Sequence, residues 1–195
     1  MGYSTDFNGK FSIAPALPET LTGFFKKFNE TRRMGRNVDK QYGIEGEFYV
    51  NGGGSYGQAS EANIINSNTP PKTQPGLWCQ WVAGGNSIEW DGGEKFYAYE
   101  DWMYYLINRI LKPLGYTVSG SVTWSGEESE DIGTLIVVNN ILFIVEGAHV
   151  TDAEEFEFYF KKGKAKKHEN DYTQMVDSLP PINNSIEGGS IKLLN

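Results

Sequence analysis

The stretch YAYEDWMYYLINRILKPLGYTVSGSVTW at residues 97–124 predicts a helix followed closely by a strand. In its first half, apolar residues recur at the spacing of one helical face. Glu100 lies in the expected first turn and Arg109 in the last, where each charge suits the helix dipole. The second half alternates apolar with polar residues, as a half-buried strand does. We therefore expect a helix over 98–112 and a strand over 116–124.

Further strand-like segments follow this pair. TLIVVNNILFIVEG at 134–147 holds two apolar runs split by Asn139 and Asn140, which predicts either a tight hairpin or one long bulged strand. EEFEFYF at 154–160 alternates phenylalanine with acidic residues and predicts an edge strand. The run KKGKAKKH at 161–168 is expected to be a solvated turn, with a docking patch for an acidic partner as the alternative.

Upstream, the pattern again changes between helix and strand. PETLTGFFKKFNETRRM at 18–34 places its leucine and phenylalanines on one face of a helix. QYGIEGEFYV at 41–50 alternates and predicts a strand with one buried face. GLWCQWV at 76–82 and SIEWDGG at 87–93 flank a short glycine-containing turn, which predicts a hairpin.

A long loop is expected over residues 51–76, because this segment is dense in Gly, Asn and Pro. It opens with the glycine-rich run NGGGSYGQ at 51–58, at the place where a phosphate-binding loop would follow a strand. The run lacks the lysine of a phosphate-binding motif and an obvious helix after it. A flexible turn is the main interpretation, and a ligand-binding loop is the alternative.

Together these elements predict an α+β fold. We expect an antiparallel sheet of about five to seven strands, with two main helices packed on one face. Residues 1–147 are expected to form a single core domain. Residues 148–195 are expected to form a C-terminal appendage made of an edge strand, a lysine-rich turn and a loosely held tail.

The composition fits one globular domain. The chain has 195 residues, of which 14% are aromatic and 22% charged, and a disordered chain does not have this balance. No apolar run is long enough to cross a membrane, and the N-terminus lacks the pattern of a signal peptide. The sequence therefore predicts a cytoplasmic protein that does not insert into membranes.

Negative charge is concentrated in the middle of the chain. The net charge is −8, and residues 44–147 carry 4 Lys and Arg against 13 Asp and Glu. A field of this sign repels phosphate backbones, so we expect no nucleic-acid binding.

Four acidic residues on the predicted strands are candidates for a site. Glu45 and Glu47 lie two residues apart and so share a strand face, and the same holds for Glu89 and Asp91. If these strands are neighbours, the carboxylates converge and could bind a divalent ion or act as an acid/base pair. The alternatives are a solvated sheet face, or ion pairs with the arginines at 32–36.

Aromatic residues crowd into the segment 78–105. Trp78, Trp90 and Tyr99 are candidates for a partly exposed platform that stacks on a partner, with a thick aromatic core as the alternative. Cys79 is the single cysteine of the chain, and we expect it to be a small buried apolar residue.

Several sequence segments of this chain resemble those of a family of small uncharacterised bacterial proteins, including proteins of mobile elements such as phages or prophages. The resemblance is carried by GLWCQW, IEWDGGEKFYAYEDW and GYTVSGSVTWSGEESEDIG, with TRRM and YGIEGEF, and spans about residues 3–145. The family has no assigned activity, so the resemblance implies no functional residues. It favours an accessory role such as inhibition of a host or rival protein.

The leading functional hypothesis is a non-enzymatic binding or inhibitor protein that uses an acidic sheet face and exposed aromatics. Its partner would be a protein with a basic or mixed surface. One alternative is a small metal-dependent hydrolase or nucleotide-handling enzyme, and another is a structural assembly protein. No cofactor is predicted, a divalent metal remains an option, and the sequence leaves the oligomeric state open.

Overall fold

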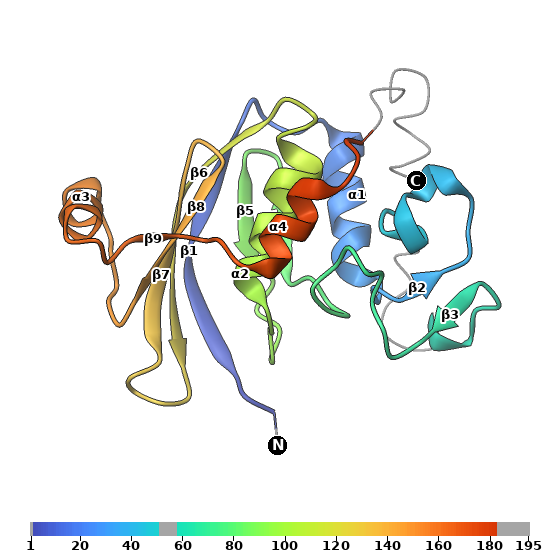
Figure 1. Ribbon diagram of the computed structural model, residues 1–195, viewed down its shortest axis with the longest axis horizontal. Coiled ribbons are helices and arrows are strands. Elements are labelled where there is room, and N and C mark those ends of the chain that lie inside the picture. Colours follow the sequence, from blue (N-terminus) through green and yellow to red (C-terminus); the bar gives the residue numbers. More distant parts are fainter. Residues whose placement is uncertain (1, 51–57, 183–195) are drawn as a thin grey trace.

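An antiparallel sheet of seven strands forms the centre of the molecule (Figure 1). The computed structural model describes residues 2–50 and 58–182. The strands of this sheet are β1 (Thr5–Ala14), β4 (Trp81–Gly84), β5 (Ser87–Trp90), β6 (Thr117–Gly126), β7 (Ile132–Val138), β8 (Ile141–Glu146) and β9 (Lys166–Lys167). Their spatial order is β4-β5-β1-β6-β7-β8-β9. The expected α+β fold is confirmed.

Helices cover both faces of this sheet (Figure 1). One face carries α1 (Glu19–Glu30), α2 (Tyr99–Tyr105) and α4 (Asp171–Ser178), and the other carries α3 (Ala153–Lys161). The segment η4 (Leu106–Leu111) continues α2 as a π-helix. The two helices expected on one face are thus present, and α1 ends before the predicted position.

Two apolar layers result from this arrangement. The main core lies between the sheet and α1, α2 and η4, where Phe28, Trp81 and Trp102 are almost fully buried. A smaller core lies under α3, around Ile136 and Val145. Strand β7 contributes to both layers, which explains why its sequence is an uninterrupted apolar run rather than an alternating one.

A separate small unit lies beyond α1 in Figure 1. It contains the two-stranded sheet of β2 (Gly35–Arg36) and β3 (Ile64–Asn66), with the short 3-10 helices η1 (Lys40–Tyr42), η2 (Ile44–Gly46) and η3 (Gln58–Ser60). The predicted loop over 51–76 therefore contains η3 and β3. Its glycine-rich run is outside the described residues up to position 57, so that prediction stays untested.

The prediction of a strand over 41–50 is wrong, because this segment folds into η1 and η2. Gly43, Glu45 and Gly46 have positive φ angles of 76°, 54° and 74°. Such angles turn the backbone sharply and cannot belong to an extended strand. The apparent alternation does not follow burial, because Gly46, Glu47 and Phe48 are buried in succession.

The prediction of an edge strand over 154–160 is also wrong, because this segment is helix α3. Phe156, Tyr159 and Phe160 have i, i+3 and i+4 spacing and pack toward the sheet, so the same letters satisfy a helical period. Asp152 caps the helix by accepting the backbone N–H of Glu155 at 2.8 Å. The edge of the sheet is formed instead by β9.

Both predicted hairpins are present. β4 and β5 pair through a turn at Gly85 and Asn86, and β7 and β8 through Asn139 and Asn140, whose φ angles are 48° and 70°. These left-handed angles suit a tight two-residue turn. Strand β1 is absent from the sequence-based expectation, although it lies inside the sheet, between β5 and β6.

A glycine in β7 leaves room for a tryptophan of β6. Gly133 lies opposite Trp124, and a Cβ at position 133 would meet the indole at 2.1 Å. We expect Gly133→Ala to displace Trp124 and to cost about 1–3 kcal/mol of unfolding free energy.

A urea titration of this variant, followed by tryptophan fluorescence, measures that cost. The matched control is Gly23→Ala in the exposed surface of α1, where an added Cβ meets nothing within 4 Å. This control should stabilise the protein by about 0.5–1 kcal/mol. Equal effects of the two substitutions would contradict the packing argument.

Candidate functional site

The four acidic residues singled out by the sequence do not meet at one site. Glu45 accepts the backbone N–H of Lys72 at 2.8 Å, and Asp91 accepts the side-chain amide of Asn29 in α1 at 2.7 Å. Glu89 is exposed on β5. In the part of the chain that the structure describes, no group of three or more His, Cys, Asp and Glu side chains could hold a metal ion. The expected convergence of carboxylates therefore does not occur.

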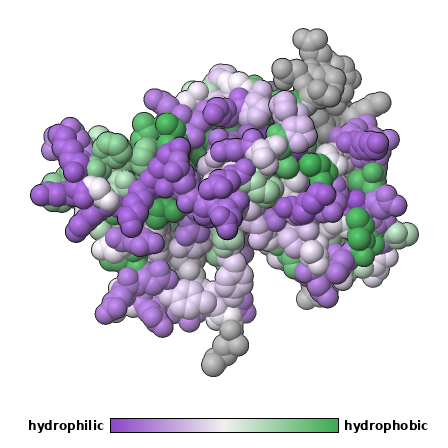
Figure 2. All heavy atoms as spheres, in the orientation of Figure 1, coloured by the Kyte–Doolittle hydropathy of each residue, from purple (hydrophilic) through white to green (hydrophobic). Residues whose placement is uncertain are grey.

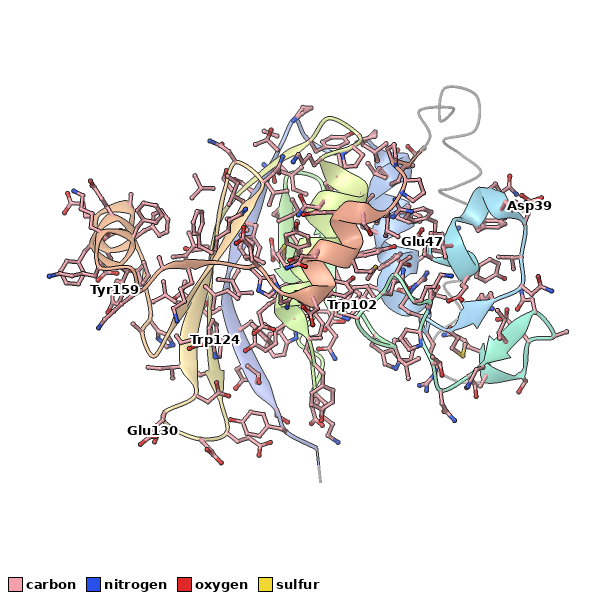
Figure 3. The ribbon with its side chains drawn as sticks, viewed as in Figure 1. Asp39, Glu47, Trp102, Trp124, Glu130 and Tyr159 are labelled. Carbon is pink, nitrogen blue, oxygen red and sulfur yellow. The ribbon has the colours of Figure 1, made fainter. Side chains whose placement is uncertain are left out.

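The fourth acidic residue, Glu47, is buried inside the molecule. Its carboxylate has no exposed surface and accepts two hydrogen bonds from Arg109 of η4, from Nη2 at 2.7 Å and from Nε at 3.1 Å. Tyr105 donates a third, at 2.9 Å. Figure 3 shows Glu47 between the helical layer and the unit of β2 and β3. Burial lowers the pKa of Arg109, but the hydrogen bond and charge of Glu47 outweigh this and raise it.

A second buried arginine extends this polar cluster. Arg33 donates to the backbone carbonyls of Glu47 and Tyr49, both at 2.7 Å, and its guanidinium lies 4.1 Å from the centre of the Phe28 ring. Burial lowers the pKa of Arg33 to about 10. Buried charged side chains such as Glu47, Arg33 and Arg109 are typical of active sites. Here they bond to one another and to the backbone, and they hold the 41–50 segment against the helices.

The three aromatic candidates lie at the margin of the main core. Trp90 and Tyr99 are partly buried and pack against it, with the Tyr99 ring 4.9 Å from the Phe7 ring. Trp78 is partly buried as well. Cys79 is fully buried, as expected, and burial raises the pKa of its thiol to about 12. A binding role for these three aromatics stays a prediction.

A group of exposed apolar side chains lies beside α3 at the end of the β7–β8 hairpin. We call it the hairpin patch, and it consists of Val138, Ile141, Phe143 and Phe160. Val138 and Ile141 face each other across the β7–β8 pair and are 37% and 44% exposed. Phe160 of α3 is 53% exposed, and its ring lies 5.8 Å from that of Phe143. Figure 2 shows hydrophobic atoms between α3 and the end of this hairpin.

The periodicity of the sequence could not locate this patch. Its residues come from three elements, and for one of these, 154–160, the alternating pattern predicts the wrong type of structure. The available signal was the continuous apolar run of β7 and β8, which is too long for a strand with one solvated face.

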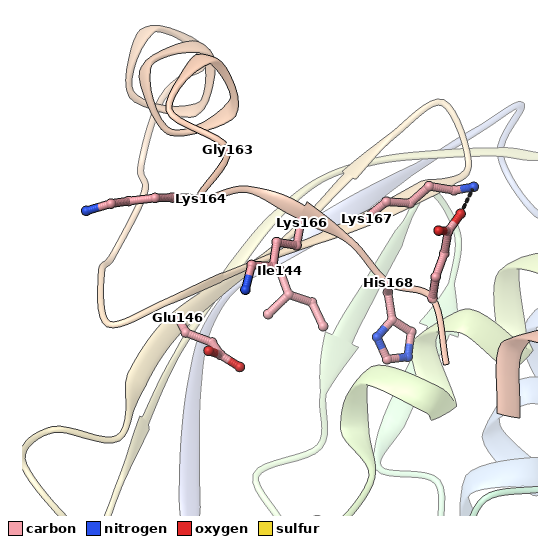
Figure 4. Close-up of a pocket in the computed structure, with 8 residues that line it drawn as sticks. Ile144, Glu146, Gly163, Lys164, Lys166, Lys167 and His168 are labelled. Carbon is pink, nitrogen blue, oxygen red and sulfur yellow. Dashed lines mark hydrogen bonds and ion pairs between the residues drawn. The ribbon is translucent and has the colours of Figure 1, made fainter. Parts of the chain in front are cut away.

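A hollow with several lysines borders the same edge of the sheet. We call it the lysine hollow; it has a volume of about 360 Å³ and is shown in Figure 4. It is lined by Ile144, Glu146, Gly163, Lys164, Lys166, Lys167, His168 and Glu169. His168 lies against α2, with its Nε2 atom 2.7 Å from the carboxylate of Asp101. Three lysines of the run 161–168, Lys164, Lys166 and Lys167, therefore line this hollow, and a role for the run in docking an acidic partner stays a prediction.

Comparisons with known proteins give no further assignment. No family model, no curated protein and no solved structure matches the chain. Within the described residues, no helix is long and apolar enough to cross a membrane.

Proposed function

We propose that the protein is a non-catalytic binding protein that docks a partner protein through the hairpin patch. The observation that supports this proposal is the exposure of Val138, Ile141 and Phe160 on one continuous surface. Large apolar side chains that gather on a surface are typical of protein interfaces, in which a few apolar anchors supply most of the affinity.

The charges around the patch favour a partner with a mixed surface. Lys161 and Lys164 follow Phe160 along the chain, whereas Glu146 and Glu157 bring the opposite sign to the same end of the molecule. A partner with acidic and basic groups around an apolar centre complements both signs. Such complementarity mainly speeds encounter and excludes wrong partners.

The finer parts of the proposal rest on the sequence. The resemblance to proteins of mobile elements favours an inhibitor of another protein, of the immunity-protein or phage-accessory kind. A cytoplasmic location agrees with the single cysteine, since disulfides are typical of secreted proteins. We do not propose the metal-dependent enzyme, because it was based on a gathering of carboxylates that the structure does not contain.

Substitution of one residue of the patch tests the proposal. We expect Ile141→Lys to weaken partner binding about 30-fold, which corresponds to about 2 kcal/mol for a buried apolar anchor. Ile65→Lys is the matched control, because Ile65 is 62% exposed on β3, outside the patch.

The measurement uses a lysate of cells that make this chain. It compares the proteins that the wild type and each of the two variants capture from that lysate. Proteins retained by the wild type and by Ile65→Lys, but lost with Ile141→Lys, would be partners of the patch. Equal capture by both variants would show that the patch is not the docking surface. Absence of any specific partner would count against a binding function.

A further inference from the structure

On the outward face of α3, acidic residues precede Phe158 and basic residues follow it at equal spacings. Glu154 and Glu155 precede Phe158 by four and three residues, and Lys161 and Lys162 follow it by three and four. Residues three and four positions apart lie on the same side of a helix. All four charged side chains therefore surround Phe158, with negative charge toward the N-terminal end of α3 and positive charge toward its C-terminal end.

Phe158 itself points away from the sheet. Phe156 and Phe160 contact the Phe143 ring of β8, at 5.4 and 5.8 Å between ring centres. A residue two positions from each of them lies about 160–200° around the helix, on the far side. Consistent with this, Phe158 is 56% exposed. In Figure 1, α3 is the outermost labelled element at its end of the molecule.

We infer that this face of α3 binds a second copy of the same chain. In an antiparallel pair of helices with a two-fold axis at Phe158, each residue lies level with the residue equally distant on the other side of Phe158 in the second copy. Glu154 and Lys161 lie on one flank of Phe158, and Glu155 and Lys162 on the other. Glu154 therefore faces Lys161 of the second copy, and Glu155 faces Lys162. Because the axis repeats every contact, the pair of Phe158 rings is flanked by complementary charges on both sides.

Contacts within one chain compete only weakly with this arrangement. Lys161 forms an ion pair with Glu157 at 2.6 Å, and both side chains are more than 60% exposed, so the pair contributes little stability. Glu155 accepts the backbone N–H of Thr151 through Oε2 at 2.8 Å. Lys162 Nζ lies 5.8 Å from the centre of the Phe158 ring in its own chain. Because Glu155 is already bonded to Thr151, the contact between Glu154 and Lys161 of the second copy carries most of the charge complementarity.

The charge order also decides between a second copy and other occupants. A parallel pair of helices would place like charges opposite each other, which is unfavourable. An anionic membrane surface would attract the two lysines and repel Glu154, Glu155 and Glu157. Only a surface with the reverse order of charges complements the whole face, and an antiparallel second copy presents that order.

The contact is small, so the dimer should be reversible. Nine helical residues span about 14 Å, and an interface centred on them falls below the area of a stable permanent dimer. Phe158 is not part of the hairpin patch, so this inference goes beyond the proposed function and can fail or succeed without it.

Charge reversal in two separate chains tests the inference. A chain with Glu154→Lys and a chain with Lys161→Glu should each lose self-association by about tenfold or more, because like charges then face each other twice. Mixed together, the two chains should associate again, since every facing pair has opposite charge. Analytical ultracentrifugation of the full chains at about 10 µM to 1 mM covers the range expected of a small interface.

Three comparisons complete the experiment. Phe158→Ser should abolish association, whereas Ile65→Ser and the patch variant Ile141→Lys should leave it unchanged. Circular dichroism of each variant confirms that α3 is folded. A wild-type protein that stays monomeric throughout the range, or a mixture that fails to associate, would overturn the inference. Binding of the monomer to vesicles of anionic lipid through Phe158 would overturn it in favour of a membrane surface.

Discussion

Replacement of Glu47 by alanine is expected to destabilise the fold by about 3–5 kcal/mol. The substitution leaves Arg109, which is 7% exposed, as a buried charge without its carboxylate partner. It also removes the acceptor of the Tyr105 hydroxyl. Domains of this kind are stable by about 5–15 kcal/mol, so the loss would be a large part of the total. Urea unfolding followed by circular dichroism measures it.

Two further variants separate the charge effect from a general effect of substitution. Glu89→Ala removes an exposed carboxylate and should change stability by less than about 0.5 kcal/mol. The double change Glu47→Leu with Arg109→Met removes both charges and should cost less than Glu47→Ala alone. A double variant that is less stable than Glu47→Ala would show that the ion pair itself, and not the unpaired charge, is what the fold requires.

The elements that the sequence predicts correctly are those in which one period dominates. The helix around Trp102 and the helix around Phe28 each have one apolar face, and the Asn139 and Asn140 turn has the chemistry of a tight hairpin. In these places the local pattern is sufficient to predict the element, because the residues that burial favours are also those that suit the backbone geometry.

The two errors occur where the alternating pattern by itself does not determine the type of element. Residues 154–160 alternate at period two and also place aromatic residues at helical spacing, and the cap at Asp152 selects the helix. Residues 41–50 look extended until Gly43 and Gly46 adopt positive φ. In both segments, single residues at the ends or turns determine the type of secondary structure. A count of apolar positions does not include the effect of these residues.

The candidate site was less accessible from the sequence than the fold. Glu47 and Glu89 are equivalent by spacing, yet one is fully buried beside Arg109 and the other is exposed. Their difference depends on a residue 62 positions away in the chain. The hairpin patch likewise depends on how far α3 extends over β8, which is a tertiary property.

The protein is expected to lose stability steeply above about pH 10. Burial raises the pKa of Tyr99, Tyr105 and Tyr172 above the ordinary value of 10.0, and raises that of Cys79 from 9.0 to about 12. In the unfolded chain these groups release their protons near their ordinary pKa values. Above those values the folded state holds more protons than the unfolded state, so stability falls as pH rises.

The size of this effect follows from the number of groups. Each group that remains protonated only in the folded state removes up to about 1.4 kcal/mol per pH unit. The contribution of these groups to the unfolding free energy is fully present below about pH 9. The contribution of Cys79 is lost between about pH 9 and 12. Arg33 acts in the opposite sense, because its pKa is lowered from 12.5 to about 10, but it is one group against four.

Urea unfolding at a series of pH values from about 7 to 11 measures the slope. Tyr99→Phe keeps the packing of the ring and removes its titration, so the loss of stability with pH should be shallower than in the wild type. Tyr97→Phe is the control, because Tyr97 is 56% exposed, and its slope should match the wild type. A wild-type unfolding free energy that is equal at pH 7 and 11 would show that these hydroxyls reach solvent, and the main core would then be less tightly closed than its burial indicates.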